Sequence, residues 1–138
     1  MRVAVTGGTG YLGAHTVRTL LDAGHSVRLL VTPADVGMPV IEAFDRLGSV
    51  SVIAGDIRDA AVVDQLLDGS EALVHAAGVV GTDKRRTELM WAINAHASEA
   101  ILSRAVALSL DPVVLVSSYS ALFTRTAGTS DRPGHPDR

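Results

Sequence analysis

Glycines recur at every third position near the start of the chain, at Gly7, Gly10 and Gly13. A β-branched run precedes them and apolar residues at helical spacing follow, so the segment predicts a strand, a tight turn and a helix. In such a turn, glycines permit the reversal, the close approach of a phosphate and close packing of the helix. The N–H groups and dipole at the helix start favour anions. The spacing therefore predicts a dinucleotide-phosphate site, and a glycine-rich turn without a ligand is the alternative.

Polar residues also stand at the ends of three later apolar runs. Asp56 follows one run, His75 closes the next and Ser118 follows the last. Each has a simpler explanation, because Asp and Ser side chains commonly cap loops and a lone histidine is more often packed or capping than catalytic. The five histidines are spread singly and without carboxylates at ligand spacing, so no metal site is predicted.

Alternating strands and helices must position these residues. Apolar and β-branched runs predict strands at 2–6, 26–32, 50–54, 72–75 and 112–117. Helical spacing predicts helices at 11–23, 40–47, 59–67 and 86–108. This order predicts an α/β fold of the Rossmann type, a doubly wound parallel sheet with helices on both faces that ends after the fifth strand. The continuously apolar fifth run is expected in the middle of the sheet.

Composition limits the function classes. The chain has 138 residues, a formal net charge of -3 and no cysteine, which favours one domain, excludes a disulfide framework and makes nucleic acid an unlikely partner. No apolar stretch approaches the ~20 residues of a membrane span, and strand 2–6 leaves no room for a leader. We expect a cytoplasmic protein without a membrane partner.

Together the motifs resemble the extended short-chain dehydrogenase/reductase family, which includes sugar-nucleotide epimerases and dehydratases, dihydroflavonol-type reductases and 3β-hydroxysteroid dehydrogenases. The resemblance covers residues 2–123. It consists of TGGTGYLG at 6–13, GDIRD at 55–59, HAAG at 75–78, a variant of NxxGT at 94–98 and a serine pair at 117–118.

The resemblance implies a role for each motif. The Asp56 carboxylate would accept the adenine amino group, and Asn94 would be a structural or proton-relay residue. Ser118 would be the catalytic serine that hydrogen-bonds the substrate carbonyl or hydroxyl. The cofactor-binding residues that it implies are Gly7, Gly8, Thr9, Gly10, Tyr11, Leu12, Gly13, Asp56, Ile57, His75, Ala76, Ala77, Gly78 and Asn94.

The choice between NAD and NADP depends on the end of the second strand, where an acidic residue normally binds the ribose 2′-hydroxyl. That position is Thr32. Without a carboxylate to repel a 2′-phosphate, Thr32 favours NADP, and NAD stays the alternative.

The family's YxxxK pair is absent, since Tyr119 is followed four residues later by Phe123. We expect a dinucleotide-binding domain at 1–123, a polar loop or disordered tail at 124–138 and no substrate domain. Such an N-terminal portion would be inactive alone, and its bare fifth strand would favour a homodimer.

The leading hypothesis is the NAD(P)-binding domain of an oxidoreductase that, at full length, transfers hydride between the cofactor and a small carbonyl or hydroxyl substrate. The alternatives are a nucleotide-sugar epimerase or dehydratase, and a non-catalytic redox sensor.

Overall fold

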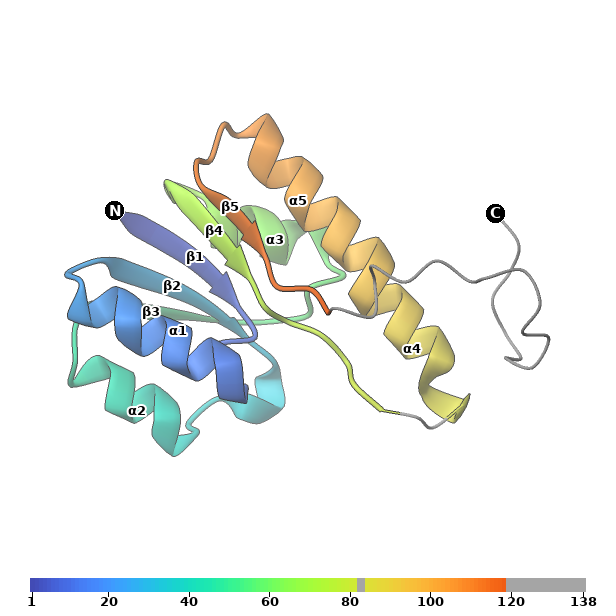
Figure 1. Cartoon of the computed structure of the whole chain (residues 1–138), viewed down its shortest axis with the longest axis horizontal. Coiled ribbons are helices and arrows are strands. Elements are labelled where there is room, and N and C mark those ends of the chain that lie inside the picture. The colour runs from blue at the N-terminus through green and yellow to red at the C-terminus, as the bar shows by residue number, and fades with distance from the viewer. Residues whose placement is uncertain (82–83, 119–138) are drawn as a thin grey trace.

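A computed structural model describes residues 1–81 and 84–118 as alternating strands and helices (Figure 1). The strands are β1 (Arg2–Thr6), β2 (Ser26–Val31), β3 (Val50–Ala54), β4 (Ala72–His75) and β5 (Val113–Leu115). The α-helices are α1 (Tyr11–Asp22), α2 (Pro39–Asp45), α3 (Ala60–Leu67), α4 (Thr87–Trp91) and α5 (Ser98–Ala107). Two short 3₁₀ turns, η1 (Pro33–Asp35) and η2 (Lys84–Arg86), and one π-helix, η3 (Ala92–Ala97), complete the order.

All described strand pairs are parallel, and the sheet order is β3-β2-β1-β4-β5. The chain crosses from one half of the sheet to the other between β3 and β4, so the order reverses beside β1. In open α/β sheets of this kind, ligands bind at the carboxyl ends of the strands near this reversal. The predicted Rossmann-type fold with a parallel sheet is confirmed.

Each face of the sheet has its own apolar core, because alternate side chains of a strand point to opposite faces. Val3 and Val5 of β1 pack with α1 and α2, in a cluster that includes Val17 and Phe44. Ala4 of β1 packs on the other face, with α3 and α5. Figure 1 shows α1 and α2 on one side of the sheet and α3 and α5 on the other. The predicted helical cover of both faces is therefore present.

The last strand differs from its prediction. β5 spans Val113–Leu115 rather than 112–117, and in the described part of the chain it is an edge strand instead of a central one. Val114 and Leu115 are 44% and 47% exposed. An unbroken apolar run identifies a strand but not its neighbours, and no described strand lies beyond β5.

The expected long helix at 86–108 is also more complex than predicted. It runs as α4, η3 and α5, and the middle six residues form a π-helix. π-helical segments are rare and occur frequently at functional sites. No helix in the described part of the chain is long and apolar enough to cross a lipid bilayer.

Candidate functional site

A cavity of about 460 Å³ lies at the carboxyl ends of β1, β2, β3 and β4. This volume lies within the range of roughly 300–1,000 Å³ that is typical of small-molecule sites. Four chain segments and one helical residue line it: Thr6, Gly7, Thr9 and Gly10; Leu30 to Pro33 with Asp35; Gly55 to Arg58; Ala76 to Val79; and Ile93. The cavity therefore lies where open α/β sheets of this strand order bind their ligands.

The glycine turn is shaped by close backbone contacts. Gly7 has φ +71°, and a Cβ there would lie 2.5 Å from the carbonyl carbon of Ala76. A Cβ at Gly13 would lie 2.0 Å from the carbonyl oxygen of Gly7, so Gly13 lets α1 pack closely against the turn. At Gly10 a Cβ would meet only that same oxygen, at 3.3 Å.

Gly10 is also the N-cap of α1, and it has no side chain to occupy the N–H groups of the first helical turn. These groups and the positive end of the helix dipole therefore remain available to an anion at the cavity. The residues around this helix start fit the pyrophosphate of a dinucleotide.

The segment after β2 brings an acidic side chain that sequence reasoning missed. Thr32 lines the cavity as expected, but so does Asp35, three residues further on in the turn η1. The Thr9 hydroxyl donates to an Asp35 carboxylate oxygen across 3.4 Å, which joins the glycine turn to η1. The only signal in the sequence was an acidic residue close behind the strand end.

The segment after β3 carries an ion pair on the cavity wall. The Arg58 Nε donates to both Asp56 carboxylate oxygens, at 2.9 and 3.1 Å, and the Arg58 backbone N–H donates to one of them at 2.9 Å. These hydrogen bonds lower the pKa of Asp56 from 3.8 to about 2. Ile57 lies between Asp56 and Arg58 in the sequence. It is buried in the core on the α3 face of the sheet and also lines the cavity. Sequence reasoning named Asp56 and Ile57 but not Arg58.

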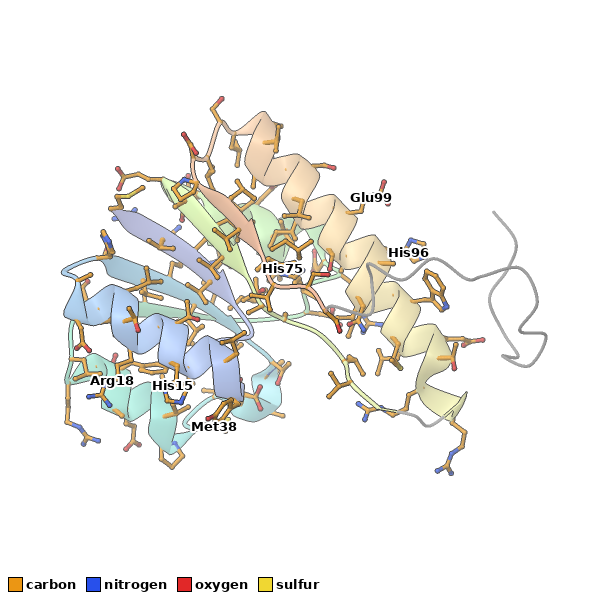
Figure 2. The ribbon with its side chains drawn as sticks, in the orientation of Figure 1. His15, Arg18, Met38, His75, His96 and Glu99 are labelled. Carbon is orange, nitrogen blue, oxygen red and sulfur yellow. The ribbon has the colours of Figure 1, made fainter. Side chains whose placement is uncertain are left out.

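The segment after β4 forms another wall, since Ala76, Ala77 and Gly78 all line the cavity. His75 does not, because its side chain is fully buried between the sheet and the long helix (Figure 2). Its Nδ1 lies 2.6 Å from the Thr6 hydroxyl, and its Nε2 lies 2.8 Å from the Ser98 hydroxyl. Burial lowers the pKa of His75 below its usual 6.5.

Asn94, in the π-helix η3, holds the next residue of that wall. Its Oδ1 accepts from the Val79 N–H at 2.7 Å, and its Nδ2 donates to the Val79 carbonyl at 2.8 Å. The amide oxygen and the amide nitrogen of Asn94 thus both bond to the backbone of Val79, which agrees with a structural role.

Four other predicted site residues lie away from the cavity. Tyr11 and Leu12 are 88% and 54% exposed at the start of α1. The position that a Cβ of Gly8 would take is blocked by the Leu29 side chain, at 2.4 Å. Ser118 is exposed and lies three residues beyond β5, at the same edge of the sheet as the cavity. The expected motif residues 119–123 and the tail 124–138 lie outside the described residues.

The sheet order and the glycine-bordered cavity define a Rossmann-like α/β domain. The model of the 3-beta hydroxysteroid dehydrogenase/isomerase family matches residues 4–136, and the chain belongs to this family. The resemblance to the extended short-chain dehydrogenase/reductases is therefore confirmed.

Relatives of known function and solved structures are similar to this chain. The chain is 32% identical, over 99% of its length, to a 3 beta-hydroxysteroid dehydrogenase/Delta 5-->4-isomerase of Mycobacterium tuberculosis, and 36% identical, over 86%, to a ceramide reductase of Caulobacter vibrioides. These matches span 37% and 35% of the two relatives. Among solved structures, a UDP-glucose-4-epimerase from Stenotrophomonas maltophila with bound NAD matches with a TM-score of 0.73 at 25% identity. That match covers 87% of this chain and 38% of the epimerase.

Proposed function

We propose that this chain is the NAD-binding domain of an oxidoreductase. The observation that carries the proposal is the cavity at the strand ends, bordered by the turn Gly7–Gly10 and by the uncapped start of α1. In the whole protein, we propose, a bound nicotinamide dinucleotide supplies hydride transfer to or from a carbonyl or hydroxyl substrate. The match to the 3-beta hydroxysteroid dehydrogenase/isomerase family favours this reaction over that of an epimerase.

The residues around the cavity have distinct tasks in this proposal. The backbone at Gly10 and the start of α1 hold the pyrophosphate. Asp56 accepts from the adenine amino group, and its hydrogen bonds to Arg58 keep the carboxylate fixed in place. The small residues Ala76 and Ala77 leave room beside the end of β4. Ser118, beyond β5 at the same edge of the sheet, orients the substrate oxygen.

The test is a pair of matched glycine substitutions measured by calorimetric titration with NAD. An added Cβ meets comparable crowding at Gly10 (3.3 Å) and at Gly48 (3.2 Å), but only Gly10 lines the cavity. We expect Gly10→Ala to weaken NAD binding about tenfold or more, because the Cβ occupies space needed by the pyrophosphate. Gly48→Ala should bind like the original protein. Equal affinities in the two variants would refute the cavity as the NAD site.

We further propose that the cofactor is NAD rather than NADP, which reverses the preference indicated by Thr32. Asp35 places a carboxylate on the cavity wall just after β2, beside the Thr9 hydroxyl. A carboxylate in this region accepts a hydrogen bond from the ribose 2′-hydroxyl and repels a 2′-phosphate. Arg58, the one arginine among the described lining residues, already pairs with Asp56.

This preference is tested by removing the charge of Asp35 alone. Asp35→Asn should bring the ratio of the NADP and NAD dissociation constants down by roughly tenfold, since a repulsion of a few kcal/mol at most is lost. Asp45→Asn, at the exposed end of α2, changes the net charge equally and should leave the ratio as it is. Tighter binding of NADP than of NAD by the unaltered protein would contradict the proposal.

A further inference from the structure

Beneath the cavity, a chain of hydrogen bonds runs through the buried His75. Four donor-acceptor contacts make it up: the Ala77 N–H to the Thr6 hydroxyl oxygen (3.2 Å), Thr6 to His75 Nδ1 (2.6 Å), His75 Nε2 to Ser98 (2.8 Å), and the Ser98 hydroxyl to the Ile93 carbonyl (3.3 Å). The chain joins the cavity wall to the start of α5. Thr6 and Ala77 line the cavity, whereas His75 and Ser98 lie behind it.

The two ends of the chain favour one arrangement of the protons in it. The Ile93 carbonyl can only accept, so the Ser98 hydroxyl donates to it and accepts from His75 Nε2–H. The Ala77 N–H can only donate, so the Thr6 hydroxyl oxygen accepts from it, and the hydrogen of that hydroxyl is left to donate to His75 Nδ1, 2.6 Å away. His75 is consequently neutral, with its proton on Nε2.

The Thr6 hydroxyl acts where the backbone ladder ends. The Ala76 N–H still donates to the Thr6 carbonyl, at 3.1 Å, as in a parallel ladder. The next N–H, that of Ala77, donates to the Thr6 hydroxyl instead. The Thr6 hydroxyl oxygen therefore anchors the wall segment at Ala77, the first residue whose N–H leaves the backbone ladder.

We propose that His75 is a positioning residue of the dinucleotide cavity: by accepting the Thr6 hydroxyl hydrogen it keeps Ala77 in place on the wall, and its protonation weakens dinucleotide binding. A proton on Nδ1 would leave the Thr6 hydrogen without its acceptor and add a second donor to the Thr6 oxygen beside the Ala77 N–H, so the hydroxyl would have to turn. The proposal rests on the proposed dinucleotide binding.

The surroundings make His75 itself the titrating group. Thr6 of β1, Ser98 of α5 and Leu115 of β5 face it or pair with it, and none of these three carries a charge. Because burial alone lowers the pKa of His75, the neutral form dominates at neutral pH. Affinity for NAD should thus be constant around neutrality and fall as the pH drops well below 6.5, the ordinary pKa of histidine.

Two measurements on the protein test the proposal. Nitrogen NMR of the imidazole, without cofactor, should show His75 protonated on Nε2 only. Titration with NAD should show binding weakened roughly tenfold by Ser98→Ala, since the unpaired Nε2–H drives the imidazole toward the other tautomer. Ser98→Thr keeps the hydroxyl and should restore the affinity. Ser103→Ala, on the exposed side of α5, is the control.

A pH series completes the design. His75→Asn offers an acceptor near the place of Nδ1 and cannot be protonated, so its NAD affinity should not fall on acidification. If this variant does not fold, the comparison of Ser98→Ala with Ser98→Thr still tests the proposal. A proton on Nδ1, or unchanged NAD binding by Ser98→Ala, would overturn this inference alone. Failure of the unaltered protein to bind NAD or NADP would overturn the proposed function and this inference with it.

Discussion

Asp56 and Arg58 form an exposed ion pair on the cavity wall, with about half of each side chain accessible to solvent. Such pairs contribute only about 0–1 kcal/mol to stability. Their value lies in geometry, because four hydrogen bonds from Arg58, one from its backbone and three from its side chain, hold one carboxylate in one orientation. The pair therefore contributes to the site more than to the fold.

The first prediction concerns the titration of this carboxyl. Its pKa of about 2 lies below 3.8, so any stabilisation by the pair is present above pH 3.8 and is lost as the pH falls through about 2. Arg58→Ala should raise the Asp56 midpoint toward 3.8 while the fold is kept, as carbon NMR of the carboxyl would report. Arg18→Ala, on α1, should leave the Asp56 midpoint in place. No change with Arg58→Ala would show that the pair does not exist in solution.

The helices are stabilised by capping residues at their ends as well as by packing. Asp59 is the N-cap of α3, and its carboxylate accepts from the Ala61 N–H at 2.9 Å. Buried residues of α3, among them Val63 and Leu66, then face the core. The cap satisfies an N–H group that has no partner within the helix.

Loss of this cap should be measurable. Asp59→Ala is expected to lower the free energy of unfolding by about 1 kcal/mol, or the melting temperature by about 4 °C. Asp22→Ala removes an exposed carboxylate that only pairs with Arg18 at 3.6 Å, and should cost less than about 0.5 kcal/mol. Thermal unfolding followed by circular dichroism compares the two. Equal melting temperatures would argue against the cap.

At the scale of the whole molecule, the faces of the sheet are better protected than its edges. Helices cover both faces, but within the described residues β5 hydrogen-bonds to β4 alone and leaves its outer edge open. Val114 and Leu115 add exposed apolar surface there. Unpaired, apolar edge strands favour association between copies.

We therefore expect the 138-residue chain to self-associate through β5. Val114→Lys should shift it toward the monomer, because a charge on an edge strand opposes edge-to-edge pairing. Val106→Lys places the same charge on α5, at a valine that is 68% exposed, and should have no such effect. Sedimentation velocity over a range of concentrations distinguishes these outcomes. A chain that is monomeric throughout that range would contradict the prediction.

The sequence by itself determined the alternation of strands and helices and the glycine turn. Strand and helix periods are properties of neighbouring residues, and the requirement for glycine at Gly7 and Gly13 follows from the steric limits of the backbone. The position of the site at the strand ends followed as well, because parallel strands bring all their carboxyl ends to one edge. These features need no knowledge of distant contacts.

Tertiary structure alone decided the side-chain contacts around the cavity, since these contacts join residues far apart in the chain. The pair of Thr9 and Asp35 spans 26 positions, and that of Thr6 and His75 spans 69. No periodicity encodes such distances. A lone histidine in the sequence could pack, cap or react, and only the folded chain shows His75 buried between the Thr6 and Ser98 hydroxyls. The short extent of β5, which ends at Leu115, was likewise decided by its pairing with β4 in the folded sheet.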